Sequence, residues 1–239
     1  MDISKKLRIK ALQDRLDEHF EHEVLNILSG QAMFEEFSSQ QLMGESDYIP
    51  FNEAMCVHET TRSIFSDEFN KVRSKGHQVS LSEYASITLA PLENLFSKKY
   101  PCIVLWFGED MFCQMNLITV LAYLEQVAFE GTVYYHAVRE QTYDVKETEI
   151  ILGNYQDIYE AVLCQHRLPD VETIPVMYQG ITMYLEWLQK DNDITRYIRD
   201  HQNQPEHELI QSLLHLFPHY GLGDTQYIEL IKASKNQKK

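Results

Sequence analysis

The sequence is short of basic residues, and this shortage limits the partners it can take. Its 239 residues hold 21 Lys and Arg against 36 Asp and Glu, which gives a formal net charge of −15. Free duplex DNA and anionic membranes attract basic surfaces, because both present phosphate groups. The negative charge is spread over both halves of the chain rather than confined to a tail. Nucleic acid and a membrane surface are therefore disfavoured as the main partners.

Cysteines and long apolar runs are also scarce. The four cysteines, Cys56, Cys102, Cys113 and Cys164, form no CxxC pair and are too few for a disulfide framework in a chain of this length. No run reaches the roughly 18 apolar residues that a membrane span needs. The first 20 residues are charged, whereas a signal peptide carries an apolar core. These features predict a cytoplasmic protein with reduced thiols and no membrane segment.

Motifs of known catalytic chemistry are missing as well. The sequence has no HExxH, no His and Cys pair with zinc-ligand spacing, and no GxSxG elbow. The segment CVHE at 56–59 mixes ligand types but has no second half elsewhere. We therefore predict no metal site and name no cofactor. Magnesium held by Glu53 and Asp110 stays compatible with the sequence, because this ion needs only one or two carboxylates.

Hydrophobic periodicity predicts an α/β fold. Helical spacing covers 3–20, and alternating strands and helices are expected after it: strands at 23–30, 49–55, 102–108, 132–139 and 149–153, and helices at 31–42, 62–75 and 111–130. The run CIVLWFG at 102–108 is apolar on both alternating faces, which is typical of a strand covered on both sides. The alternation indicates a mostly parallel, Rossmann-like sheet flanked by helices.

The second half of the chain has a different pattern. From residue 155 onward helices are expected throughout, at 155–167, 175–190, 193–200, 205–217 and 223–233. We therefore divide the chain into an N-terminal helix at 1–22, an α/β domain at 23–154 and an all-helical C-terminal domain at 155–239. Between the predicted strands, Ser80 and Glu83 fit a capping box, in which each side chain satisfies a free backbone N–H group of the other residue.

Polar residues follow the predicted strands, where open parallel sheets bind their ligands. They are Ser29 and Gly30 after the first strand, Asn52 and Glu53 after the second, Glu109, Asp110 and Gln114 after the third, and Arg139 after the fourth. We assign Glu53 and Asp110 to catalysis, as general base, hydrogen-bond acceptor or magnesium ligand. The other six are assigned to ligand binding.

Most of these residues also have a purely structural explanation. Asp110 stands where a helix N-cap belongs, a role worth about 1 kcal/mol without any catalytic duty. Glu109 fits a solvated loop charge, and Gln114 fits a hydrogen bond within the core. Asn52 suits a turn, and a single glycine at Gly30 is far from a GxGxxG phosphate loop. The sequence alone leaves both explanations open.

Two segments resemble a bacterial family, domain of unknown function 1835: PFNEAMC at 50–56 and LWFGEDMFCQMNLITVLAYLEQ at 105–126. The matching block consists of Leu105, Trp106, Phe107, Glu109, Asp110, Gln114 and Leu117. The resemblance runs from about residue 23 to 140, and 216–231 looks like the helical ending of relatives. It implies an α/β fold with its site at the strand ends, and it brings no known reaction.

Some relatives in that family carry the label of arabinose-type transcription regulators. The best candidate for a recognition helix here, 224–233, carries Asp224 and Glu229 against one basic residue, Lys232. A helix that enters a major groove normally meets phosphates with Lys and Arg. The sequence therefore speaks against DNA binding by this segment.

These observations support three hypotheses. The first is an enzyme or binding protein that takes a small polar ligand, nucleoside- or sugar-like, at the strand ends. The alternative is a non-catalytic, ligand-sensing regulator whose helical part contacts a protein partner or, less readily, DNA. The third is a helical dimerisation unit on an α/β scaffold, which would make the protein a homo-oligomer.

Overall fold

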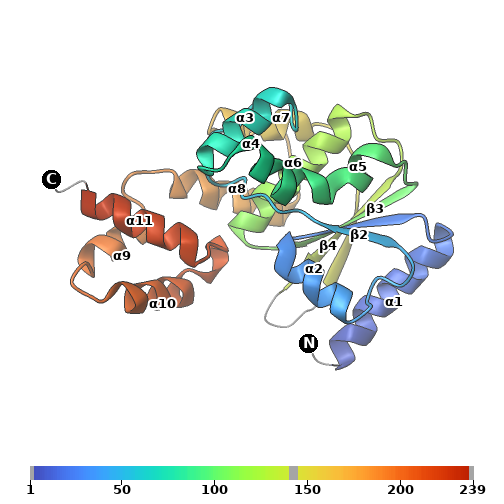
Figure 1. Ribbon diagram of the computed structural model, residues 1–239, viewed down its shortest axis with the longest axis horizontal. Helices are drawn as coiled ribbons and strands as arrows, with labels where there is room; N and C mark the ends of the chain where they lie inside the picture. Colours follow the sequence, from blue (N-terminus) through green and yellow to red (C-terminus); the bar gives the residue numbers. More distant parts are fainter. Residues whose placement is uncertain (1–2, 140–144, 237–239) are drawn as a thin grey trace.

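A twisted five-stranded sheet forms the centre of the computed structural model, which describes residues 3–139 and 145–236 (Figure 1). The strands are β1 (Val24–Leu28), β2 (Asp47–Pro50), β3 (Cys102–Gly108), β4 (Thr132–Val138) and β5 (Val145–Ile150). Their order is β2-β1-β3-β4-β5, with β1 to β4 mutually parallel and β5 antiparallel to β4. The prediction of an α/β fold with a mostly parallel sheet is confirmed.

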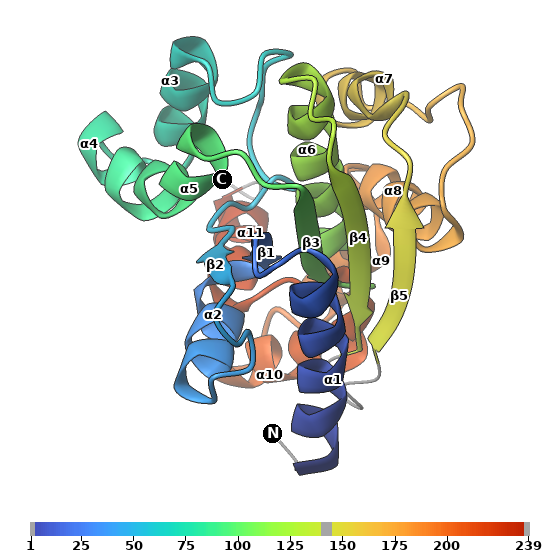
Figure 2. The ribbon, with the colours of Figure 1, turned by 90° about the vertical axis from the view of Figure 1, so that its right-hand side faces the viewer.

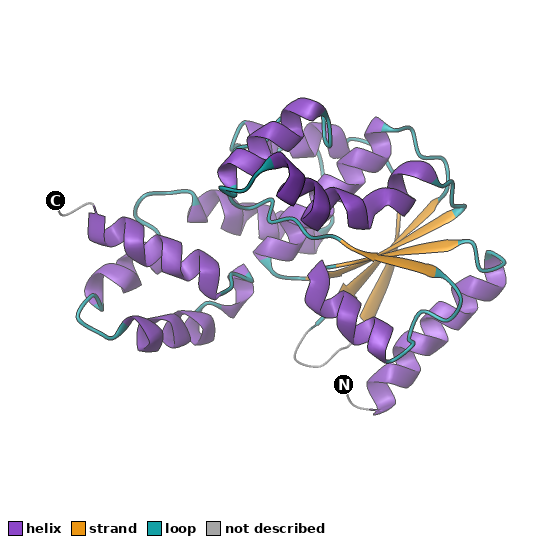
Figure 3. Ribbon diagram, in the orientation of Figure 1, coloured by secondary structure: helices purple, strands orange, loops and turns teal. Residues whose placement is uncertain are grey.

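Helices cover both faces of this sheet (Figure 3). In the α/β part they are α1 (Ile3–His19), α2 (Gly30–Ser39), α3 (Asp67–Gly76), α4 (Leu81–Tyr84), α5 (Glu93–Ser97), α6 (Met111–Gln126) and α7 (Tyr155–Tyr159). The C-terminal helices are α8 (Pro175–Trp187), α9 (Asp193–Asp200), α10 (Glu206–Leu216) and α11 (Asp224–Asn236). The helical C-terminal region expected from the sequence is therefore present.

The two faces of the sheet bury two separate apolar clusters. On β3, Val104 and Trp106 pack with α1 and α2, whereas Leu105 and Phe107 pack with the residues of α6. This alternation follows from the period of two along a strand, in which successive side chains point to opposite faces. Because both faces are covered, every residue of β3 is buried. The uninterrupted apolar run at 102–108 predicted this environment.

Helix α6 occupies the middle of the larger layer and is apolar nearly all round. Its buried residues extend from Met111 to Leu124, because the sheet lies on one side and α7 and α8 pack on the other (Figure 2). A helix that is apolar on all sides is expected to be enclosed in this way. It ends at Gln126, short of the predicted residue 130, and Ala128 just beyond it adopts a positive φ of 52°.

Other predicted boundaries shift for identifiable reasons. The strand expected at 49–55 is β2, which ends at Pro50, because the chain leaves the sheet after Phe51 has donated its N–H to the Leu28 carbonyl at 2.8 Å. The helix expected at 62–75 begins at Asp67, since the Ser66 side chain accepts the N–H of Phe69 at 3.2 Å and caps it. The capping box at Ser80 is confirmed.

The last strand differs most from its prediction. The segment expected at 149–153 is the end of β5, which begins at Val145 and pairs antiparallel with β4 at the edge of the sheet. Five of its six residues are half-buried or exposed, as is usual for a strand at the edge of a sheet. Because the sequence of β5 is largely polar, its apolar pattern is too weak to predict the whole strand.

Helices α9, α10 and α11 lie together at one end of the molecule (Figure 1). Their buried apolar residues, which include Ile194, Leu213 and Tyr227, belong to the same continuous core as α6. None of the helices in the described parts of the chain combines the length and the apolar character needed to cross a membrane.

Candidate functional site

The carboxyl ends of β1 and β2 lie level with each other, because Leu28 pairs with Pro50. From β1 the chain proceeds to β2 on one side, while β3 lies on its other side, so the order of the strands reverses here. Ligands of open α/β sheets bind at such a reversal, outside the carboxyl ends of the strands. A cavity of about 450 Å³ is located at this position. We call it the strand-end cavity.

The lining of the strand-end cavity combines apolar and polar groups. The apolar side is formed by Phe51, Val79, Tyr84, Ile87 and Phe112, and the polar groups come from Ser29, Gly30, Asn52, Glu53, His77 and Thr88. Four of the sequence-predicted site residues are therefore brought together here: Ser29, Gly30, Asn52 and Glu53. The other four, Glu109, Asp110, Gln114 and Arg139, are not among the described residues that line it.

Glu53 lies at the centre of a buried polar network beside this cavity. Its side chain is 1% exposed and that of Arg73, its ion-pair partner, is 0% exposed. The guanidinium donates from Nη2 to Oε1 at 2.8 Å and from Nε to Oε2 at 3.2 Å. Tyr84 donates its hydroxyl to Oε2 at 2.6 Å, and the N–H of Ala54 donates to Oε1 at 2.8 Å. Both carboxylate oxygens are thus engaged within the protein.

His77 is held by the same carboxylate. Its Nε2 lies 2.7 Å from Glu53 Oε1 and 3.2 Å from Arg73 Nη2. Because an ionised carboxylate can only accept hydrogen bonds, Nε2–H donates to Glu53. The two hydrogens of Arg73 Nη2 are directed at Glu53 and at the carbonyl of Ala54, so its approach to Nε2 is a close contact between two donors. The ring is 25% exposed and lines the strand-end cavity. In the neutral ring, Nδ1 is consequently the nitrogen that can accept a proton.

The charge of Glu53 is fixed by these contacts. Burial raises the pKa of its carboxyl group, but the hydrogen bond from His77 and the positive charge of Arg73 outweigh burial and hold the pKa well below its usual range. A carboxylate with so low a pKa and with all its near neighbours donating to it is a poor proton acceptor. The geometry suits Glu53 to orient His77.

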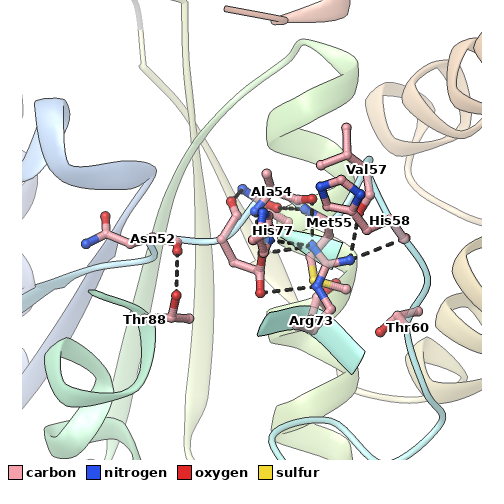
Figure 4. A network of polar contacts seen from close by, with 12 residues as sticks. Asn52, Ala54, Met55, Val57, His58, Thr60, Arg73, His77 and Thr88 are labelled. Carbon is pink, nitrogen blue, oxygen red and sulfur yellow. Dashed lines mark hydrogen bonds and ion pairs between the residues drawn. The ribbon is translucent and has the colours of Figure 1, made fainter. Parts of the chain in front are cut away.

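Arg73 also fastens the loop that follows β2. Its Nη1 donates to the carbonyl of Val57 at 2.6 Å and to that of Glu59 at 3.2 Å, and its Nη2 donates to the carbonyl of Ala54 at 2.8 Å. Figure 4 shows Arg73 reaching from α3 to this loop, with His77 one helical turn further on. From α6, Asn116 donates to the carbonyl of Glu53 at 2.7 Å. One side of the cavity is thereby held rigidly in place.

The remaining polar groups of the cavity come from three elements. Asn52 donates from Nδ2 to the side chain of Gln31 and to the carbonyl of Ile87, each at 3.2 Å. Thr88 donates its hydroxyl to the carbonyl of Asn52 at 3.0 Å (Figure 4). Ser29 Oγ lies 3.2 Å from Cys113 Sγ and makes no side-chain cap on α2.

Asp110 serves as the N-cap of α6, as one reading of the sequence predicts. Its Oδ1 accepts the N–H of Cys113 at 2.8 Å, and burial raises the pKa of its carboxyl group. Gly221, in the turn before α11, packs directly against this carboxylate, so that a Cβ on Gly221 would overlap it. The turn between the C-terminal helices therefore covers Asp110.

Gln114, Glu109 and Arg139 also find partners within the protein. Gln114 is fully buried and donates from Nε2 to the carbonyl of Gly108 at 2.6 Å and to the hydroxyl of Tyr135 at 2.8 Å, which is the core role expected as the alternative. Arg139 Nε donates to Glu109 Oε2 at 2.8 Å across an exposed ion pair.

The sequence prediction missed the residues on α3 and α4. A signal for Arg73 was present: it stands four residues after Phe69, on the buried face of an amphipathic helix, where a charged side chain requires a partner. Nothing in the local pattern singles out His77, because its role depends on Glu53, 24 residues earlier.

The described residues contain no group of three or more His, Cys, Asp or Glu side chains arranged to share a metal ion. Each of the four cysteines is a free thiol, and all but Cys164 are buried. Burial raises the pKa of the Cys113 thiol well above its ordinary value.

Comparison with protein-family models, with curated proteins and with solved structures gives no significant match to this chain. The resemblance to domain of unknown function 1835 therefore stays an expectation from the sequence.

Proposed function

We propose that the protein binds a small polar ligand of the nucleoside class in the strand-end cavity and that His77 exchanges a proton with it. The observation that carries this proposal is the placement of His77: its ring lines a cavity at the strand ends, and the buried Glu53 fixes its Nε2 as the protonated nitrogen. A histidine ring with one nitrogen held as a donor can accept and return a proton at the other nitrogen, as general acid–base catalysis requires.

The lining of the cavity supports the ligand class. Phe51, Tyr84 and Phe112 offer apolar ring surface to a flat heterocycle, while Ser29 and Asn52 offer hydrogen bonds to its hydroxyl groups. A nucleobase can stack its whole flat face on these rings, whereas a free sugar can offer them only C–H groups. The volume of about 450 Å³ lies in the range of small-molecule sites.

Within this proposal the two ends of the histidine ring have separate tasks. Glu53 holds Nε2–H and stabilises the imidazolium that forms when the ring takes up a proton. Nδ1 accepts that proton from a ligand hydroxyl group or from water. Arg73 acts through Glu53, so both are positioning residues and His77 is the catalytic residue.

Isothermal titration calorimetry with adenosine, guanosine, cytidine and uridine tests the binding. Asn52→Ala should lower the affinity for the tightest-binding nucleoside about tenfold, because one hydrogen bond is lost and its partner group on the ligand stays unpaired. Asn203→Ala, in the exposed loop after α9, is the matched control and should leave affinity unchanged. The proposal fails if no nucleoside binds, or if the two variants bind it equally well.

A second candidate function is ligand sensing by a regulator whose helical part contacts a protein partner. It is favoured by the contact between Gly221 and Asp110, which places the turn before α11 against the first turn of α6, where Phe112 lines the cavity. Hydrogen exchange with and without the nucleoside separates the two functions. A regulator should change the protection of 217–231, whereas an enzyme alone should change only the segments that line the cavity.

The cellular setting follows as part of the proposal. Four free thiols support a cytoplasmic location, which cell fractionation tests. The net charge of −15 supports partners other than nucleic acid, and a titration with random duplex DNA at low salt should show no binding. A homo-oligomer stays a prediction, which sedimentation velocity measures.

A further inference from the structure

A second cavity lies where the loop after β2 meets the C-terminal helices. It has a volume of about 400 Å³ and is lined by the loop segment 56–59, by α8 and by α11, with His166 beside them. We call it the helix-junction cavity. None of its lining residues lines the strand-end cavity, so it requires its own explanation.

The walls of this cavity are aromatic. Tyr184 and Trp187 of α8 have ring centroids 6.3 Å apart at an interplanar angle of 42°, and His166 meets Tyr184 edge-on at 6.2 Å. Tyr184 is buried, whereas Trp187 is half-buried, so Trp187 offers the accessible aromatic surface of this lining. A positive group placed over the face of Trp or Tyr is attracted by the negative face of its π system.

The charges around the helix-junction cavity have the same sign. Glu59 and Glu229 belong to its lining, and neither carboxylate makes a hydrogen bond or an ion pair with another described residue. No Lys or Arg is among the described residues that line it. The cavity thus carries two carboxylates with no cation beside them, in a protein of net charge −15.

Of the two histidines in this lining, His58 is held toward its neutral form. Burial lowers the pKa of His58, and the charges of His77 and Arg73 lower it further, against the opposing attraction of Glu229 and Glu53. Two neighbours constrain the position of His58. Its ring meets that of His77 edge-on at 4.9 Å, and its side chain packs so closely on Gly76 that a Cβ at position 76 would overlap it.

We propose that the helix-junction cavity binds a small organic cation of the quaternary ammonium class, seated against the ring of Trp187 and near the carboxylates of Glu59 and Glu229. A trimethylammonium group is positive and has no hydrogen-bond donors, so ring faces and nearby carboxylates satisfy it without further partners. A bare metal ion is a poorer fit, because the described residues supply no set of three ligands. This proposal is independent of the nucleoside site.

Calorimetric titration with choline and with 3,3-dimethyl-1-butanol, its uncharged isostere, tests the proposal on the full chain. Choline should bind about tenfold or more tightly than the isostere, because only choline gains the cation–π and carboxylate attraction. Equal affinity of the two compounds, or no binding of choline at millimolar concentration, overturns the proposal.

Three variants locate the binding. Position 229 is exposed, so the Glu229→Gln protein should fold normally. Its affinity for choline should be about three- to tenfold lower. Trp187→Leu should weaken choline at least as much. Glu208→Gln removes the same charge from the exposed face of α10 and should leave affinity unchanged. If Glu229→Gln and Glu208→Gln have equal effects, choline binds elsewhere and the proposal is wrong.

A cross-titration keeps the two sites distinguishable. Asn52→Ala should leave choline binding unchanged, and Glu229→Gln should leave nucleoside binding unchanged. Loss of choline binding in Asn52→Ala would place the cation in the strand-end cavity and overturn the second site.

Discussion

Removing the guanidinium of Arg73 tests the buried network most severely. Arg73→Met keeps the apolar stem but leaves the carboxylate of Glu53, which is 1% exposed, without its cation. It also removes the donors of the Ala54, Val57 and Glu59 carbonyls. Breaking a buried pair on one side costs about 3–5 kcal/mol, because an uncompensated buried charge remains.

The measurement is the free energy of unfolding, from urea titrations followed by far-ultraviolet circular dichroism. For a chain of this size, each kcal/mol corresponds to about 2–4 °C, so a loss of about 3–5 kcal/mol should lower the melting temperature by about 6–20 °C. The matched control is Arg196→Met, which breaks two surface ion pairs, with Asp191 and Asp193, of an arginine that is 48% exposed. Exposed pairs of this kind stabilise a fold far less than buried pairs do, so this variant should unfold close to the parent protein. If both variants lose the same free energy, the network does not stabilise the fold as argued.

Three further predictions concern other parts of the structure. Burial lowers the pKa of His136 to about 4, against the opposing hydrogen bond and charge of Glu147. A histidine in the unfolded chain has a pKa of about 6.5. The buried, neutral His136 therefore makes its full contribution to stability above that pH, and this contribution is lost as the pH drops toward 4. Through His136, the free energy of unfolding should fall by about 2 kcal/mol between about pH 7 and pH 5, and His136→Gln should abolish this part of the fall. Urea titrations at both pH values measure it; an unchanged profile in the variant would show that His136 does not titrate in this way. Asp110→Ala should cost about 1 kcal/mol of unfolding free energy through loss of the α6 cap, whereas Asp110→Asn should cost much less; equal losses in the two variants would contradict the capping role. Gly221→Ala should destabilise the protein more than Gly30→Ala, because both glycines have a positive φ but only at Gly221 would the new Cβ overlap a neighbour, Asp110; thermal melts of the two variants decide the order.

Local patterns in the sequence were sufficient for much of the fold. The run at 102–108 predicted β3 with its bounds, and the all-round apolar segment after it predicted the enclosed helix α6. Both predictions succeeded because burial on every side shows directly in consecutive residues. The edge strand β5 was placed only in part, and its direction depends on pairing with β4, which no local pattern encodes.

The site was predictable to a smaller extent, for a related reason. The rule that ligands bind at strand ends found Ser29, Gly30, Asn52 and Glu53 at one cavity. It could not show that Glu53 is paired with an arginine 20 residues later or that a C-terminal turn covers Asp110. Such contacts join segments far apart in the sequence, so they depend on the packing of the whole chain.

Nuclear magnetic resonance of the histidine side chains tests the central claim most directly. The chain has ten histidines, of which His77 lines the strand-end cavity, while His58 and His166 line the helix-junction cavity. We predict that a nucleoside moves the imidazole nitrogen resonances of His77 and leaves those of His166 and of the exposed His215 in place. Nucleosides that leave the His77 resonances unchanged, or that move those of His215 instead, would contradict the claim that this cavity is the ligand site.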